Sequence, residues 1–135
     1  AVVYHIDIVV AEFQEGALVE DEEFLFTARA MDFNGTVDAS FLPEIIRLAR
    51  ENNVRLILVH ERTLLFPAAA AEPKALQEYK HALAEYLKAE GVPLIDFSYD
   101  PRLPADYFTD VLHMNDTGKA AFTQLLAEAL KPLLP

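Results

Sequence analysis

The chain has 135 residues, 53% of them hydrophobic, and a formal net charge of −11. This length is enough for one domain with its own core, and the hydrophobic fraction argues against a disordered chain. The acidic balance argues against nucleic acid or an anionic membrane surface as a partner, because both require a basic protein surface, and the absence of cysteine excludes disulfides and thiolate metal sites.

Three apolar runs rich in β-branched residues predict buried strands, and the segments between them show helical periodicity. In chain order, the strands are expected at residues 2–13, 54–60 and 92–98. A short helix is expected within residues 19–35, followed by a turn at Asn34-Gly35. Longer helices are expected from Asp38 or Ser40 to about residue 53, from residues 72–73 to a C-terminal glycine at Gly91, and from residues 115–116 to Pro132.

Strands that alternate with helices predict a single α/β domain over residues 1–135, with a three-layer α/β/α arrangement and a mainly parallel, flavodoxin-like sheet. In such a sheet, ligands bind beyond the carboxyl ends of the strands. The residues expected at that edge are Glu12 near the end of the first strand, His60 at the end of the second, and Asp96 and Ser98 at the end of the third.

The segment that follows the third strand carries an aspartate and a histidine in the spacing D-x-x-H, at Asp110 and His113. A carboxylate bonded to one imidazole nitrogen fixes the tautomer and stabilises the charged ring, which makes the histidine a good general base. The alternative is structural, with Asp110 ending a turn and His113 a packed or solvated loop residue. Asn115 and Asp116 are interpreted as N-caps of the last helix, and Gly118 as a position of close packing.

His60 has two interpretations, as a second polar wall of a cleft or as the polar end of an apolar strand. Together with His113 and Asp110 it has the ligand types of a metal site, but no H-x-x-x-H or other ligand spacing supports one. The sequence therefore predicts that the protein uses neither a metal nor another cofactor. His81 lies within a predicted helix beside charged residues and is expected at the surface.

The stretch "GVPLIDFSYDPRLPADYFTDVLHMNDTGKAAFTQLLAEAL" resembles the last block of the SGNH (GDSL-like) hydrolase superfamily, where a D-x-x-H loop precedes a terminal helix opened by an N-x-x-G-like turn. The likeness extends in outline over residues 37–134. It implies that the chain is the C-terminal part of a larger SGNH-like domain, in which Asp110 orients His113 and His113 is the general base. The implied reaction is ester hydrolysis or O-acyl transfer by a serine nucleophile.

The resemblance is nearest to a branch of membrane-associated and periplasmic acyltransferase-like proteins. That branch implies an acyl ester of a carbohydrate or cell-wall polymer as substrate, and a periplasmic or membrane-associated location. An incomplete sheet would expose a strand edge, so we also expect self-association or a partner chain that covers this edge.

The chain departs from the family pattern at the nucleophile. It has no G-D-S motif, its serines are Ser40 and Ser98, and Asn34-Gly35 does not match the family's G-x-N. One hypothesis places the nucleophile outside this chain. An alternative is a non-catalytic α/β module that binds a carbohydrate or a protein. A flavodoxin-like or receiver-like function ranks last, because the chain lacks a glycine-rich phosphate loop and an acidic cluster after the first predicted strand.

Overall fold

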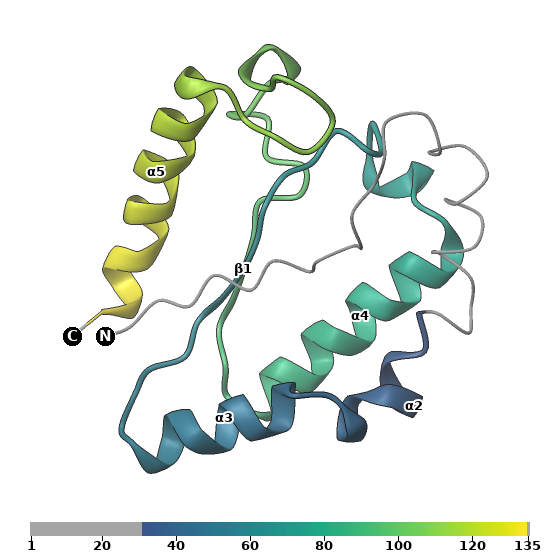
Figure 1. Ribbon diagram of the computed structural model, residues 1–135, viewed down its shortest axis with the longest axis vertical. Coiled ribbons are helices and arrows are strands. Elements are labelled where there is room, and N and C mark those ends of the chain that lie inside the picture. Colours follow the sequence, from purple (N-terminus) through teal and green to yellow (C-terminus); the bar gives the residue numbers. More distant parts are fainter. Residues whose placement is uncertain (1–30, 135) are drawn as a thin grey trace. The chain divides into compact units, whose positions relative to one another are not determined.

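The computed structural model describes residues 31–134 of the chain. Its strands are β1 (Leu58–His60) and β2 (Leu94–Asp96) (Figure 1). The α-helices of this part of the chain are α2 (Phe33–Thr36), α3 (Leu42–Glu51), α4 (Lys74–Ala89) and α5 (Asp116–Leu130), and its 3-10 helices are η1 (Val37–Ala39), η2 (Ala69–Ala71), η3 (Ala105–Tyr107) and η4 (Lys131–Leu133). The strand predicted at residues 2–13 and most of the segment at 19–35 lie outside the described residues.

β1 and β2 are neighbours in one sheet, and α4 lies between them in the chain. The amide of Leu58 donates to the carbonyl oxygen of Pro93 at 2.9 Å, and the amide of Phe97 donates to the carbonyl oxygen of His60 at 2.8 Å. These bonds give a parallel ladder with a helical connection, which is the α/β class. The predicted fold class is confirmed in an incomplete form, because the sheet within residues 31–134 has two strands.

The strands of the described part are shorter than predicted at residues 54–60 and 92–98. Residues 54–57 lead into β1 without strand pairing, and the amide of Val54 bonds instead to the carbonyl oxygen of Ala49 at the end of α3. Apolar character therefore marks burial beyond the strand itself, since Leu56 and Ile57 are buried although they lie outside β1. No helix in the described part of the chain has both the length and the apolar character needed to cross a membrane.

The start of the described region differs from the prediction in two places. Asn34 and Gly35 do not form a separate turn but lie inside α2, because the carboxylate of Asp32 caps that helix and accepts a hydrogen bond from the amide of Gly35 at 2.9 Å. Ser40 is not the N-cap of α3, which is Phe41. The Ser40 hydroxyl donates to the carbonyl oxygen of Val37 at 2.7 Å and accepts from the amide of Leu42 at 3.2 Å.

The chain divides into two compact units. The N-terminal unit contains the described residues 31–58 and 72–94, and thus α2, α3 and α4. Its core consists of Ile46, Leu56, Leu87 and Val92. Gly91 follows α4 with φ +65°, the left-handed conformation that favours glycine at the C′ position of a helix, so this predicted helix end is confirmed.

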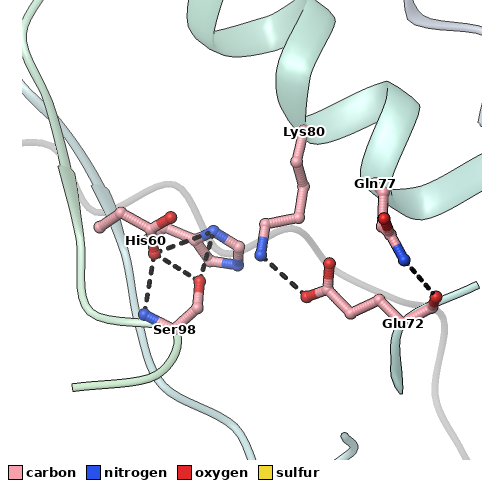
Figure 2. A network of polar contacts seen from close by, with 6 residues as sticks. His60, Glu72, Gln77, Lys80 and Ser98 are labelled. Carbon is pink, nitrogen blue, oxygen red and sulfur yellow. Dashed lines mark hydrogen bonds and ion pairs between the residues drawn. The ribbon is translucent and has the colours of Figure 1, made fainter. Parts of the chain in front are cut away.

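A partly buried ion pair lies where α4 begins. Glu72 is buried, and its carboxylate contacts the ammonium of Lys80 at 2.9 Å (Figure 2). The carbonyl oxygen of Glu72 accepts a hydrogen bond from Nε2 of Gln77 at 2.7 Å. A buried carboxylate requires a partner, which Lys80 supplies. Together the two bonds attach the segment before α4 to the first and second turns of the helix.

The C-terminal unit contains residues 59–71 and the described residues from 95 to 134, and thus α5. Phe97, Leu103 and Phe122 form its buried core, and the rings of Phe97 and Phe122 meet edge to face with their centroids 5.3 Å apart. α5 packs its apolar face on this core. The D-x-x-H loop and the ends of both strands belong to this unit, which therefore holds every candidate site residue that the structure describes.

Candidate functional site

The D-x-x-H segment is a loop closed by backbone hydrogen bonds at its base. Phe108 and Met114 form an antiparallel bridge, and the amide of Thr109 donates to the carbonyl oxygen of His113 at 2.8 Å. The amide of Asn115 donates to the carbonyl oxygen of Tyr107 at 2.9 Å. These bonds bring the two ends of the loop together, so that Asp110 lies at its tip and His113 lies opposite Thr109 where the tip closes.

Asp110 holds both the backbone and the side chain of His113. Its Oδ1 accepts hydrogen bonds from the amides of Leu112 and His113, each at 2.8 Å. Nδ1 of His113 lies 2.8 Å from Oδ2 and 3.0 Å from Oδ1 of the same carboxylate. The structure thus brings together the two residues that the sequence singled out, through a contact between neighbours in the chain.

The electrostatics of this pair decide which ring nitrogen carries the proton. The pKa of the Asp110 carboxyl is lowered, first by the hydrogen bond from the amide of Leu112, then by the imidazole of His113 and the amide of His113. An ionised carboxylate only accepts hydrogen bonds, so Nδ1 of His113 is the donor and Nε2 of the neutral ring holds the lone pair. The imidazole is well exposed, with a side-chain exposure of 75%, so Nε2 is suited to exchange a proton with a bound molecule.

The helix that follows secures the loop. Asn115 is the N-cap of α5, and its Oδ1 accepts a hydrogen bond from the amide of Gly118 at 3.0 Å. Its Nδ2 donates to the carbonyl oxygen of Asp106 at 2.8 Å. The predicted N-cap at Asn115 is therefore confirmed, and Asp116 is the first residue of α5 instead. The amide of Leu64 also donates to the carbonyl oxygen of Val111 at 2.8 Å, which ties the segment after β1 to the loop.

A second polar cluster lies at the carboxyl ends of the two strands. The hydroxyl of Ser98 lies 3.0 Å from Nδ1 of His60 (Figure 2) and makes a short hydrogen bond to Oδ1 of Asp96. Oδ1 of Asp96 also accepts from the amide of Ser98 at 2.8 Å and lies 3.6 Å from Nδ1 of His60. The sequence predicted that these residues lie at one edge of the sheet, but not that their side chains form hydrogen bonds with one another. The available signal was the D-x-S spacing of Asp96 and Ser98 at the end of one strand and the histidine His60 at the end of the other.

The two clusters use different partners. Within residues 31–134, Asp110 is the side chain that contacts the His113 ring, while the Ser98 hydroxyl contacts His60 and Asp96. No group of three or more histidine, aspartate or glutamate side chains suited to a metal ion occurs in the described part of the chain. The site therefore offers two imidazoles, each with a carboxylate close by, and no metal-ligand set among the described residues.

Among solved structures, the chain is similar to a GDSL-like lipase from Bacteroides thetaiotaomicron VPI-5482. The TM-score is 0.47 and the sequence identity is 21%; the match covers 69% of this chain and 50% of the lipase chain. The chain thus spans about half the length of that lipase. No model of a known protein family and no curated protein matches the chain.

Proposed function

We propose that Asp110 and His113 are the acid–base pair of an SGNH-type ester-hydrolysing or acyl-transferring site whose nucleophile lies outside this chain. The observation that carries the proposal is the contact of the Asp110 carboxylate with Nδ1 of His113 at 2.8 Å, on an exposed imidazole. A histidine oriented in this way by a carboxylate is the acid–base half of a nucleophilic acyl-transfer site.

In the proposed reaction, Nε2 of His113 takes the proton of a serine hydroxyl as the serine oxygen attacks the ester carbonyl carbon. Asp110 stabilises the imidazolium that forms. The imidazolium then returns the proton to the departing alkoxide, the ester C–O bond breaks, and the acyl group stays on the serine. In the second half, water or a sugar hydroxyl attacks the acyl carbonyl carbon while His113 takes its proton. The bond from the acyl carbon to the serine oxygen then breaks, and the imidazolium returns the proton to that oxygen, which releases the acid or the new ester.

The contacts of the chain's serines support the search for a nucleophile elsewhere. The Ser40 hydroxyl is engaged with the backbone at the start of α3, donating to Val37 and accepting from Leu42. Ser98 is buried, with 7% exposure, and its hydroxyl bonds to His60 and Asp96. Neither hydroxyl is placed as the partner of His113.

By family resemblance, the proposed substrate is an acyl ester of a carbohydrate or cell-wall polymer.

The test is labelling with a fluorophosphonate serine-hydrolase probe, read by mass spectrometry. We would label this chain and the protein encoded by the longest natural open reading frame that contains it. We expect the probe to form one serine adduct in the longer protein. His113→Ala should lower the labelling rate about 10²- to 10⁴-fold, the range that general-base catalysis contributes. His81→Ala is the matched control, because His81 is an exposed histidine on α4, and it should label at the normal rate.

Three other results would reject parts of the proposal. An unchanged labelling rate in His113→Ala would remove His113 from the chemistry. An adduct on Ser98 in this chain would show that the nucleophile lies within it. A longer protein that takes no adduct, and that binds a polysaccharide or protein without changing it, would favour the non-catalytic binding module.

A further inference from the structure

The cluster of His60, Ser98 and Asp96 has no role in the function proposed above. In it, the hydroxyl of Ser98 contacts both the imidazole of His60 and the carboxylate of Asp96. His60 ends β1, and Ser98 lies two residues beyond the end of β2, so the two side chains meet at the carboxyl edge of the parallel pair. Ser98 is buried, while the side chains of His60 and Asp96 are 35% and 48% exposed. This arrangement differs from the D-x-x-H loop, where the carboxylate contacts the imidazole directly.

The direction of the hydrogen bonds follows from counting protons. The Ser98 hydroxyl has one proton, and among the described residues its oxygen lies close to Oδ1 of Asp96 and to Nδ1 of His60. A carboxylate can only accept, so the hydroxyl proton lies toward Asp96. The hydroxyl oxygen then accepts from His60, and Nδ1 must be the nitrogen that carries the ring proton. His60 therefore donates a hydrogen bond to Ser98, and Ser98 donates one to Asp96.

The alternative role for Ser98, as a nucleophile activated by His60, requires the opposite direction. In that case the hydroxyl would give its proton to Nδ1, and the Ser98 oxygen would face Oδ1 of Asp96 with no proton between them. Two oxygens with lone pairs at hydrogen-bond distance repel each other, so this arrangement is unfavourable while Asp96 is a carboxylate. The burial of Ser98 also leaves little room for an ester carbonyl to approach its hydroxyl.

We propose that Ser98 is a positioning residue that links Asp96 to His60 and holds His60 in the tautomer with its proton on Nδ1, so that Nε2 of His60 carries the lone pair of the neutral ring. The direct distance from Nδ1 of His60 to Oδ1 of Asp96 is 3.6 Å, longer than a normal hydrogen bond, so the serine hydroxyl is the link between them. The inference does not depend on the role of Asp110 and His113.

The experiment is a ¹⁵N NMR measurement of histidine tautomers on the whole chain, at a pH where the imidazoles are neutral. Two- and three-bond couplings to the ring carbons' protons show which nitrogen is protonated, and His60→Gln identifies the His60 signals by their loss. We expect Nδ1 of His60 protonated and Nε2 bare. A proton on Nε2, or an equal mixture of both tautomers, would overturn the proposal.

Two serine variants then test the link itself. Ser98→Ala removes the hydroxyl, and we expect the ratio of the two His60 tautomers to change about fivefold toward Nε2–H, as loss of a hydrogen bond of about 1 kcal/mol gives. Ser40→Ala is the matched control, because that hydroxyl bonds only to backbone groups near α3 among the described residues, and it should leave the ratio unchanged. An unchanged ratio in a folded Ser98→Ala protein, judged by its amide spectrum, would remove Ser98 from this role.

Discussion

Gly118, in the first turn of α5, lies so close to Tyr107 that a β-carbon added to the glycine would be 2.2 Å from the Tyr107 carbonyl oxygen. The same carbonyl oxygen accepts the hydrogen bond from the amide of Asn115 that closes the D-x-x-H loop. Gly118 is buried, and the obstructing atom belongs to the backbone, so the neighbour cannot move aside by changing a rotamer. The glycine therefore decides how closely α5 approaches the base of the loop.

Gly118→Ala should destabilise the protein even though alanine is the better helix former. The added methyl group forces α5 and the segment at Tyr107 apart, and overpacking of this kind costs about 1–3 kcal/mol in free energy of unfolding. Urea denaturation measures the change, with Thr117→Ala as the control because Thr117 is exposed in the same turn. A Gly118→Ala protein as stable as Thr117→Ala would mean that this contact is not tight in solution.

Asn115 supports the loop through two side-chain atoms, Oδ1 and Nδ2. Two substitutions distinguish the contributions of these atoms. Asn115→Ala removes both the cap of α5 and the bond to the Asp106 carbonyl oxygen, and we expect a loss of about 1–2 kcal/mol in free energy of unfolding. Asn115→Asp keeps a capping oxygen, and its charge is favourable at a helix N-terminus, so it should lose less. Urea denaturation of both proteins gives the comparison; equal losses would show that the cap contributes little.

Asp110 should titrate below the usual range of an aspartate. Its folded-state pKa is lowered, so the bonds that it makes as a carboxylate stabilise the loop above the unfolded pKa of about 3.9, and they are lost as the pH falls through the lower folded pKa. The ¹³C signal of the Asp110 carboxyl, followed with the amide of Leu112, measures the midpoint. In His113→Ala the midpoint should rise but stay below the value in the urea-unfolded chain, because the Leu112 amide is the largest cause of the shift. A midpoint at or above about 3.9 in the folded protein would contradict the hydrogen bonds seen here.

Leu87 on α4 is fully buried in the core of the N-terminal unit, with 0% exposure. Leu87→Ala should lower the free energy of unfolding by about 2–5 kcal/mol, because it removes apolar contacts and leaves a cavity. Leu48→Ala on α3 is the matched control, since Leu48 is 44% exposed and its truncation should cost less than about 1 kcal/mol. Similar losses in the two variants, measured by urea denaturation, would mean that the core is packed differently.

Local signals in the sequence predicted the helices well and the strands less well. Gly91 as the residue after α4 and Asn115 as the N-cap of α5 depend on backbone groups a few residues away, which a short window contains. The extent of a strand depends instead on which distant segment pairs with it, as Leu58 does with Pro93. Asn34-Gly35 failed as a predicted turn because Asp32, two residues earlier, supplies the cap that starts a helix there.

The candidate residues divide in the same way. The contact of Asp110 with His113 joins residues three apart, so the spacing offered it as one of two interpretations and the family resemblance implied it. Ser98 and His60 are 38 residues apart, and their meeting depends on the register of β1 against β2. The sheet-edge rule placed both residues at one edge, but no rule of spacing predicts a hydrogen bond between two side chains on different strands.

The bridge between Phe108 and Met114 also has a consequence for how the protein folds. Closing so short a segment costs little chain entropy, and it requires neither strand of the sheet. Contacts between near neighbours form fast, so the arrangement of Asp110 and His113 can be in place before the long-range pairing of β1 with β2. In native-state hydrogen exchange, the amides of Leu112 and His113, which bond to Asp110, should then open independently of the amides of Leu58 and Phe97, which bond across the strands.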